Sequence, residues 1–553
     1  MLEKNKLSII TFFALLLGLV TYYHGLFIDL TGDAGKYAAI ARHMLESGDY
    51  INLKIHGEPY DQKPPLLFWL ATFGYKIGGL NNFSYKIFAV LYAFLGLFFT
   101  YKIGEVLYDK RTGKIAAYLL FFCECYFLYC MDVHTDLVLQ TNVAFAIWQL
   151  AEYLRSKKTL NFILAFIGIG LAIMSKGPIG GAVPAFALGT HLIMKKDFKQ
   201  LFHPKWILGI IIAMAIASPA LIGLYNQFGS DGIKFFFWTN NIGRISGEYV
   251  GKNTDYSFYL HTLLYLFAPW SLLMYGSIYH EFRSVFKKPF QQKEYLLIGG
   301  ILFYFIIISV ARGKSPNYIF ILIPLLAVLT AKWIALFLDH PDKKGFKVFK
   351  TMQGIYFSLL WVFLFIMMFY LFPSGNWRYW LISAVVLILC ALIYIQKDHT
   401  LEKLLLPSIL IISMVAFYMN SYMLPYAYTF QAPPKAARIF NEKAKNGDQL
   451  YNYLYGQYEV FFYGKTNAIQ VKDKKQLEEV LKKPGSWIFT TEAGYDSIKS
   501  FKMPIDAVYQ FRHRGMNKIG GKFIFPKTRE SSLKLMFFIK TPDRDQTTST
   551  LKP

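Results

Sequence analysis

Residues 7–28 read LSIITFFALLLGLVTYYHGLFI, an apolar run that follows Lys4 and Lys6. The hydrocarbon core of a bilayer is ~30 Å thick, so a helix that crosses it needs ~20 apolar residues at ~1.5 Å each. A cleaved signal peptide would carry small residues where this run has Tyr22, Tyr23 and His24. We therefore predict an uncleaved first membrane helix, with the N-terminus on the cytoplasmic side.

The composition of the whole chain is typical of a membrane protein. Of its 553 residues, 54% are hydrophobic and only 17% are charged, which excludes the polar surface of an ordinary soluble protein. A mean hydropathy of +0.32 excludes intrinsic disorder, because disorder requires low hydrophobicity. All four cysteines lie in apolar runs, so we expect no disulfide framework.

The same length criterion predicts thirteen membrane helices. Besides the first, the expected spans lie near residues 84–104, 115–131, 136–154, 160–174, 178–194, 206–225, 259–279, 295–311, 317–338, 349–372, 378–396 and 404–424. Loops rich in Lys and Arg alternate with loops poor in them, and positive loops stay in the cytoplasm, so an odd number of spans puts the C-terminus outside. The expected fold class is a mainly α-helical polytopic membrane protein, with its membrane domain at residues 1–424.

Two long loops, residues 29–83 and 226–258, are expected on the outer side together with the tail, residues 425–553. Short alternating apolar runs in the tail predict a small extracytoplasmic α/β domain with a disordered end. The predicted helix is Lys474–Lys482, and the predicted strands are Leu450–Phe462, Trp487–Thr490, Ala507–Phe511, Lys522–Phe525 and Leu533–Ile539. Because the cytoplasmic loops are short, we expect any chemistry on the outer side.

The first outer loop contains the sequence DAGK at residues 33–36. Asp33 and Lys36 are three residues apart and therefore share one face of a helix. A carboxylate here can accept a proton from an attacking hydroxyl, and a cation beside it can hold a phosphate. The alternative is a solvated helix with a local ion pair.

Other cations precede apolar segments on the expected outer side, where the positive-inside rule predicts few of them. Lys63 stands before Pro64 and Pro65, which restrict the backbone at the start of a helix. The remaining cations of this kind are Lys176, Arg244, Arg312 and Lys314. Singly, such residues can be helix starts or headgroup contacts, but together they indicate an anionic substrate.

A short outer turn brings Asp132, His134 and Asp136 together. Carboxylate and imidazole groups can ligate a metal or position a substrate, and a solvated turn is the alternative that we favour over a metal site. His56 and His261 are further possible ligands on the outer side. We retain His261 as a possible ligand of a divalent metal, and we expect no required cofactor.

In order and spacing, these motifs resemble those of polytopic GT-C glycosyltransferases that use polyprenyl-phosphate-linked sugars. The likeness is greatest to the bacterial aminoarabinose transferases of lipid A and the protein O-mannosyltransferases. It extends over residues 7–330 and rests on Asp33–Ala41, Met44–Asp49, Lys63–Pro65, Ser175–Pro178, Asn241–Arg244, Pro269–Ser271, Lys314, Pro316 and Tyr318. Three positions depart from the family's pattern: Lys36 stands where Arg is usual, Gln62 where Glu is frequent, and Ser315 where Leu is usual.

The resemblance implies that Asp33 is the catalytic carboxylate. It also implies roles for seven further residues: Lys36, Lys63, Arg244, Lys314 and Tyr318 in binding the donor phosphate, and Asp136 and Lys176 in positioning the substrate. The implied reaction moves a sugar from a polyprenyl-phosphate donor to lipid A, a glycolipid or a protein, at the outer face of the bacterial inner membrane. Direct displacement would invert the anomeric carbon. The expected partners are donor, acceptor and membrane lipids, with no nucleic acid.

A transporter or flippase for a lipid-linked sugar is the alternative from another class, because many spans and outer cations also suit the passage of an anionic substrate. Such transporters tend to have internal repeats, and this sequence shows no convincing repeat. A non-enzymatic scaffold does not account for the convergent cations. We therefore predict a glycosyltransferase and keep the transporter as its alternative.

Overall fold

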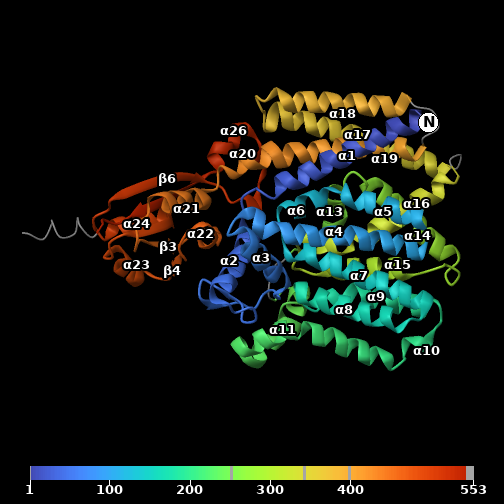
Figure 1. The fold of residues 1–553 in the computed structure, drawn as a ribbon, viewed down its shortest axis with the longest axis horizontal. Helices are drawn as coiled ribbons and strands as arrows, with labels where there is room; N and C mark the ends of the chain where they lie inside the picture. Colours follow the sequence, from blue (N-terminus) through green and yellow to red (C-terminus); the bar gives the residue numbers. More distant parts are fainter. Residues whose placement is uncertain (1, 249–252, 341–343, 396–399, 544–553) are drawn as a thin grey trace, which may run out of the picture.

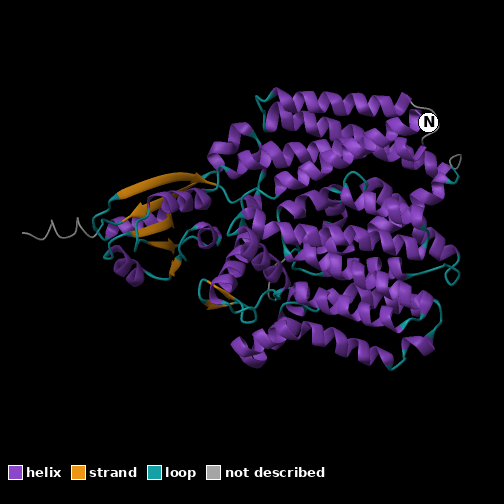
Figure 2. Ribbon diagram, in the orientation of Figure 1, coloured by secondary structure: helices purple, strands orange, loops and turns teal. Residues whose placement is uncertain are grey.

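The computed structural model describes residues 2–248, 253–340, 344–395 and 400–543. A large bundle of helices lies beside a smaller C-terminal region that contains a sheet (Figure 1). Five of the seven described strands belong to that region, and strands are concentrated there in Figure 2. We call the end of the bundle next to this region the sheet end, and the opposite end, where α1 (Leu2–Gly25) begins, the far end.

Within the described residues, eight helical stretches are long and apolar enough to cross a membrane. They lie in α1, α4 (Asn82–Leu107), α8 (Thr159–Lys176), α11 (Lys205–Lys234), a 3₁₀ helix (Pro316–Leu322) continued by α16 (Ile323–Leu338), α17 (Lys344–Ile366), α18 (Trp377–Ile395), and α19 (Thr400–Tyr418) continued by a π-helical turn and α20 (Leu424–Tyr428). A bent pair, α5 (Lys110–Phe121) and α6 (Glu124–Met131), raises the number to nine if it is one span. The structure therefore confirms a polytopic helical fold but not the predicted number of thirteen.

The predicted spans that do not meet this criterion are short, polar or broken. α9 (Ile179–Met194) and α15 (Leu296–Val310) are apolar but shorter than 18 residues. α7 (Thr135–Ser156) is long enough, but buried Gln and Asn side chains make it less apolar. The span predicted near 259–279 is two helices, α13 (Phe258–Leu266) and α14 (Ser271–Lys287), because Pro269 between them cannot donate a helical hydrogen bond.

The first helix, α1, has one apolar side that is exposed and another that packs against the core. Ile9, Phe12, Leu16 and Leu19 are large, apolar and exposed at helical spacing, and the opposite side of α1 is buried in the core. A water-soluble protein would bury this stripe, whereas a bilayer solvates it. The exposed stripe therefore agrees with a membrane-spanning helix.

Short elements at the sheet end connect the long helices. Between α1 and α4 the chain forms α2 (Gly32–Ser47), a small hairpin of β1 (Lys54–Ile55) and β2 (Glu58–Pro59), and α3 (Leu66–Gly78). After α11, which passes a kink at Gly229 and ends in a π-helical turn, comes α12 (Ile242–Ser246). At the far end, α10 (Phe198–Leu201) precedes α11. The loops predicted at 29–83 and 226–258 thus contain helices of their own.

The C-terminal region contains a five-stranded mixed sheet in the order β4-β3-β5-β7-β6. Its strands are β3 (Gln449–Tyr453), β4 (Ile469–Val471), β5 (Ser486–Thr491), β6 (Ala507–His513) and β7 (Lys534–Lys540), and its helices are α21 (Ala432–Lys443), α22 (Glu459–Tyr463), α23 (Lys474–Leu481), α24 (Glu492–Ser500), α25 (Gly521–Ile524) and α26 (Pro526–Arg529). β3 pairs in parallel with β4 and β5, and β7 pairs antiparallel to β5 and β6. The small C-terminal α/β unit expected from the sequence is therefore present.

Individual predictions in this region had mixed outcomes. The helix predicted at Lys474–Lys482 is α23, whose N-cap Asp473 accepts a hydrogen bond from the Gln476 amide. The strand predicted at Lys522–Phe525 is wrong, because α25 and α26 occupy this segment. The strand predicted at Leu450–Phe462 ends at Tyr453 and is followed by α22. The end predicted to be disordered, residues 544–553, lies outside the described residues.

Candidate active site

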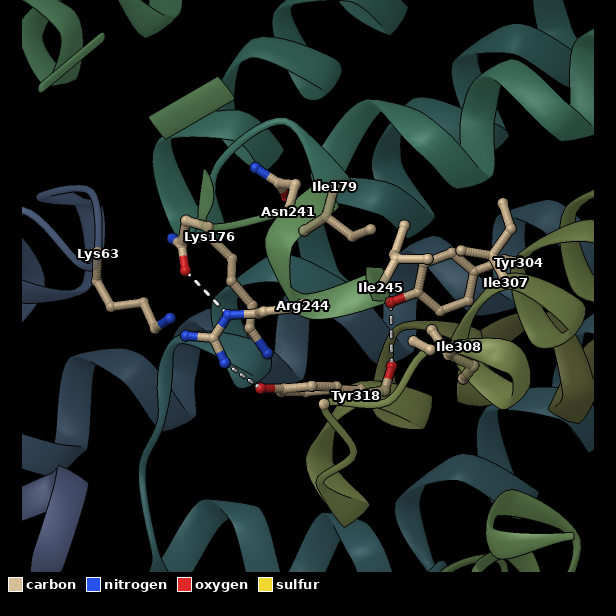
Figure 3. A pocket seen from close by; sticks show the side chains of 13 residues that line it. Lys63, Lys176, Ile179, Asn241, Arg244, Ile245, Tyr304, Ile307, Ile308 and Tyr318 are labelled. Atoms are coloured by element: carbon tan, nitrogen blue, oxygen red, sulfur yellow. Dashed lines mark hydrogen bonds between the residues drawn. The ribbon is translucent and has the colours of Figure 1, made fainter. Parts of the chain in front are cut away.

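A pocket with about 650 Å³ of empty space, part of it open to solvent, lies at the sheet end of the bundle (Figure 3). It forms where the loop before α3, the end of α8, the start of α9, α12, the end of α15 and the 3₁₀ helix Pro316–Leu322 meet. Its polar lining residues are Lys63, Lys176, Asn240, Asn241, Arg244 and Tyr318.

Lys63 reaches this pocket from the loop that ends at Pro64 and Pro65, and its side chain points toward Arg244 in Figure 3. Among the residues that the structure describes, Lys63 has no hydrogen bond or ion pair. Burial, together with the positive charges of Lys176 and Arg244, lowers its pKa to about 7. An unpaired cation beside two others is costly unless an anion binds there, so this group indicates an anion-binding site.

Lys176 is the last residue of α8 and pairs with Asp136, the second residue of α7. The Lys176 ammonium also lies 4.4 Å from the centre of the Tyr318 ring. Asn317 Nδ2 donates a hydrogen bond of 2.6 Å to the other oxygen of Asp136, which is almost completely buried. Asp136 thus connects α8 with the 3₁₀ helix and holds Lys176 at the pocket.

Arg244 on α12 is held from both sides. Its Nη1 donates to the Tyr318 hydroxyl at 2.7 Å, and its Nε donates to Asn240 Oδ1 at 3.0 Å. Asn240 in turn donates to the carbonyl oxygen of Gln62 at 3.2 Å, which ties α12 to the loop that carries Lys63. These bonds restrict the guanidinium before any ligand arrives, and such preorganisation favours binding of a fixed anionic group.

The other wall of the pocket is apolar. It is formed by Ile179, Ile245, Tyr304, Ile307 and Ile308, with Ala311 at the end of α15. The Tyr304 hydroxyl donates to the Tyr318 carbonyl oxygen at 3.2 Å, so the apolar wall and the cationic wall are joined. A ligand that fits both walls carries an anionic head and an apolar part.

Asp33 is the second residue of α2, and its side chain is 51% exposed. Its carboxylate lies 2.7 Å from Lys36 Nζ, as the three-residue spacing predicts. Burial raises the pKa of Asp33, but the charges of Lys36, His134 and Lys63 outweigh burial and the pKa is below its ordinary value. Lys63 therefore interacts electrostatically both with Asp33 and with the cations of the pocket.

His134 lies in the turn between α6 and α7, which is more buried than the solvated turn expected from the sequence. Its side chain is 18% exposed and its Nε2 lies 3.2 Å from Asp132 Oδ2. Burial lowers the pKa of His134, but Asp132, Asp33 and Asp136 raise it to about 9. A protonated imidazole thus adds a positive charge near Asp33.

Five predicted site residues are not part of the pocket lining: Asp33, Lys36 and Asp136, described above, and Lys314 and His261. Lys314 Nζ donates to the carbonyl oxygen of Asn253 at 2.9 Å and lies 5.6 Å from the Tyr256 ring. His261 on α13 is about half exposed and lies 2.9 Å from one carboxylate, Asp255. The described residues contain no group of three or more His, Cys, Asp or Glu side chains that could hold a metal ion.

The structure thus brings together five residues that the sequence pointed to from separate segments: Lys63, Asp136, Lys176, Arg244 and Tyr318. Asn240 and Asn317 were missed, although both are hydrogen-bonded to this group. Neither residue is charged, so no charge or hydropathy pattern marks them. Asn317 lies inside the motif around Pro316 and Tyr318, which was the one available signal.

Comparison with known proteins adds independent information. Residues 62–222 match the family of dolichyl-phosphate-mannose-protein mannosyltransferases. The chain is 24% identical to an uncharacterized protein of Aquifex aeolicus over 82% of this chain and 86% of that protein. It is 27% identical to the undecaprenyl phosphate-alpha-4-amino-4-deoxy-L-arabinose arabinosyl transferase of Edwardsiella ictaluri over 55% of each protein. The alignment therefore spans little more than half of that transferase.

The structural comparison covers nearly all of the chain. The crystal structure of ArnT from Cupriavidus metallidurans bound to undecaprenyl phosphate matches 96% of this chain and 97% of that chain, with a TM-score of 0.72 and 18% sequence identity. This chain has the fold of ArnT. The resemblance to GT-C glycosyltransferases noted from the sequence motifs is confirmed, as is the ArnT-like membrane fold with a small C-terminal sheet region.

Proposed function

We propose that this chain is an integral membrane glycosyltransferase that moves a sugar from a polyprenyl-phosphate donor to an acceptor at the outer face of the bacterial inner membrane. The observation that carries the proposal is Lys63, an unpaired cation next to Lys176 and Arg244 in a pocket with an apolar wall. A phosphate bonded to a long apolar chain meets both walls. The likeness to ArnT, which was crystallised with undecaprenyl phosphate, supports the same ligand class.

The donor half of the reaction suits these residues. When the bond between the sugar C1 and the phosphate oxygen breaks, the electron pair stays on the polyprenyl phosphate. Lys63, Lys176 and Arg244, with the hydroxyl of Tyr318, are the groups that stabilise this negative charge. Fixed cations can therefore replace a general acid, and the leaving group needs no proton.

The acceptor half is assigned to Asp33. A carboxylate with a lowered pKa is a weak base, so Asp33 orients an acceptor hydroxyl and receives its proton only as the new bond forms. If the acceptor is a phosphate of lipid A, it is already largely ionised, and Asp33 mainly positions it. Direct attack on C1 inverts the anomeric carbon. We place Lys36 and His134 beside Asp33 as the cations that keep it ionised.

The proposal includes a membrane orientation. The alternation of positive loops supports a cytoplasmic N-terminus, with α2, the pocket and the C-terminal region (residues 425–553) outside. The membrane domain then comprises residues 1–424. Lipid A, another glycolipid or a protein remain the candidate acceptors, and we assign Lys314 a secondary contact with the donor phosphate beyond the pocket lining.

The test compares lipid A and extracted surface glycoconjugates by mass spectrometry in cells with this gene intact, deleted, or carrying Asp33→Asn. We expect one sugar mass to disappear from the same molecule in both altered strains, which also identifies the acceptor. Loss on deletion with retention in Asp33→Asn would contradict the assignment of Asp33 and favour a transporter. No change on deletion, in cells that produce the donor, would overturn the proposed function.

A further inference from the structure

The C-terminal region forms hydrogen bonds with both ends of α2, the helix that carries Asp33. The Tyr463 hydroxyl accepts a hydrogen bond of 2.6 Å from the Leu30 amide, just before α2 begins. Near the other end of α2, Arg42 Nη1 donates to the carbonyl oxygens of Phe461 and Phe462 at 3.2 and 3.1 Å. All three residues of the C-terminal region belong to α22, which lies beside α2 (Figure 1).

The start of α2 lacks the usual cap. Thr31 is the N-cap residue, and a threonine there normally accepts a hydrogen bond from an amide of the first turn, but its side chain accepts none. Instead, Glu459 Oε1 accepts hydrogen bonds from the Gly32 amide at 2.8 Å and from the Thr31 hydroxyl at 3.4 Å. The cap of α2 therefore comes from a residue 427 positions later in the chain.

The surroundings of Glu459 fix its carboxylate at the start of α2. It is 1% exposed, and its second oxygen accepts a hydrogen bond of 3.3 Å from the Tyr455 hydroxyl. A Cβ added to Gly35 would lie 3.2 Å from Glu459 Cγ, so a glycine at this position allows the close approach of the two helices. Gly32 has a φ of +53°, and an added Cβ there would lie 2.9 Å from Asn517, also in the C-terminal region. The backbone on both sides of Asp33 is thus fitted to residues far away in the sequence.

We propose that Glu459 is a positioning residue for catalysis: it caps α2 from the C-terminal region of the same chain and thereby holds Asp33 in its working position beside Lys36 and the pocket. The catalytic part of this inference rests on the proposed function, whereas the cap itself does not. Glu459 does not line the donor pocket, whose cations come from the α3 loop, α8 and α12. Its loss must therefore slow turnover without weakening donor binding.

The experiment uses the full chain in lipid nanodiscs. Glu459→Ala removes both acceptor oxygens, and Glu459→Gln keeps one oxygen for the Gly32 amide. Glu479→Ala, a change of an exposed glutamate on α23 in the same region, is the matched control. Three quantities are measured: kcat and KM for the donor, binding of undecaprenyl phosphate, and hydrogen exchange of amides in residues 30–36.

We expect Glu459→Ala to lower kcat about 10- to 100-fold, because small displacements of a catalytic group have effects of this size. Its KM and its affinity for undecaprenyl phosphate should stay within about twofold of the wild type, since no ground-state contact with the donor is lost. Amides 30–36 should exchange faster, and Glu459→Gln should largely restore both kcat and protection. Glu479→Ala should change none of these quantities.

Unchanged protection of residues 30–36 in Glu459→Ala would overturn the cap, and an equal loss of donor binding and turnover would overturn a positioning role. Gly35→Ala disturbs the same contact from the α2 side, so it should also lower kcat without affecting binding, even if Glu459→Ala fails to fold. If wild-type protein transfers no sugar from any donor, the proposed function fails. Hydrogen exchange still decides whether Glu459 caps α2.

Discussion

The two ends of the helical bundle treat their charges differently. At the far end, Lys332 Nζ lies 2.6 Å from Glu281 Oε2, which also accepts a hydrogen bond of 2.8 Å from Trp333 Nε1. At the sheet end, Lys63, Lys176 and Arg244 line one pocket, and the buried Asp136 pairs with Lys176. The same helical stretch, Pro316–Leu338, contributes Tyr318 to one group and Lys332 to the other.

This comparison distinguishes ion pairs that hold helices together from cations that are placed to bind an anionic ligand. A partly buried cation with its own carboxylate, as at Lys332, is neutralised within the protein and contributes to packing. A surplus of partly buried positive charge is unfavourable in the absence of an anion, and it is retained where an anion binds. Of the four predictions below, the first two alter matched charges at the two ends of the bundle, and the last two test the group of cations at the sheet end.

The largest effect is expected for the acids. Asp33→Asn should lower the rate of transfer about 1,000-fold or more, because it removes the carboxylate that we propose orients and deprotonates the acceptor. Glu281→Gln at the far end should leave the rate per folded molecule unchanged and lower the melting temperature, because Lys332 loses its partner. Turnover and thermal unfolding of purified protein check both. A normal rate in Asp33→Asn would remove this residue from the mechanism.

The cations give the next largest effect. Lys63→Met should weaken binding of undecaprenyl phosphate about 10- to 100-fold, the size expected for a lost charge-assisted hydrogen bond, without destabilising the fold. Lys332→Met should do the opposite: it should leave binding intact and destabilise the protein by about 3 kcal/mol, because Glu281 is left unpaired. Equilibrium binding and thermal unfolding provide the two readouts. If Lys63→Met and Lys332→Met weakened binding equally, the proposal that only the sheet end binds an anion would be contradicted.

The protonation of Lys63 should make donor binding depend on pH. Because burial and neighbouring cations lower the pKa of Lys63 to about 7, the charged fraction falls as pH rises through neutrality. The apparent Kd for undecaprenyl phosphate should therefore rise roughly five- to tenfold between about pH 6.5 and 8, relative to Lys63→Arg, whose guanidinium stays charged. The ratio of the two proteins cancels the ionisation of the ligand phosphate itself. A ratio that does not vary with pH would contradict a titrating Lys63.

The smallest effect concerns a neutral side chain. Asn317→Ala removes the hydrogen bond to Asp136 and so loosens the group that holds Lys176. We expect donor binding to weaken about two- to fivefold, in proportion to one hydrogen bond acting through a neighbour. Asn467→Ala, a change of an exposed residue in the C-terminal region, is the matched control. Binding that is unaffected by Asn317→Ala would show that Asp136 holds Lys176 unaided.

Much of the fold follows from local patterns in the sequence. Apolar length predicted the first helix and most of the long membrane helices, because the bilayer imposes its thickness on every span. The predicted count of thirteen is not confirmed, in part because α7 is buried among other helices and carries glutamine and asparagine side chains that lipid would not solvate. The strand predicted at Lys522–Phe525 is wrong because an apolar run can also be buried in a helix. Phe523 lies in α25 and is fully buried without pairing to the sheet.

The candidate site was predictable to the extent that charge is unusual near a membrane. Lys63, Lys176 and Arg244 were found because cations there require an anionic partner. Asn240, Asn317 and Glu459 were not, because their roles depend on contacts with segments 178, 181 and 427 residues away. No local pattern encodes such distances. Lys314 shares the pattern of the pocket cations but bonds to Asn253, so the pattern alone does not reveal where a side chain points.

The cap on α2 also has a consequence for how the protein is made. A ribosome adds about 5–20 residues per second, so roughly 20 to 90 seconds separate the emergence of Gly32 from that of Glu459. Once Tyr318 has been made, all residues of the pocket are present, while the start of α2 still lacks the cap that Glu459 provides. On the proposed mechanism, a nascent chain binds a lipid phosphate before it can transfer sugar at its full rate, because that rate requires the C-terminal region to be synthesised and docked.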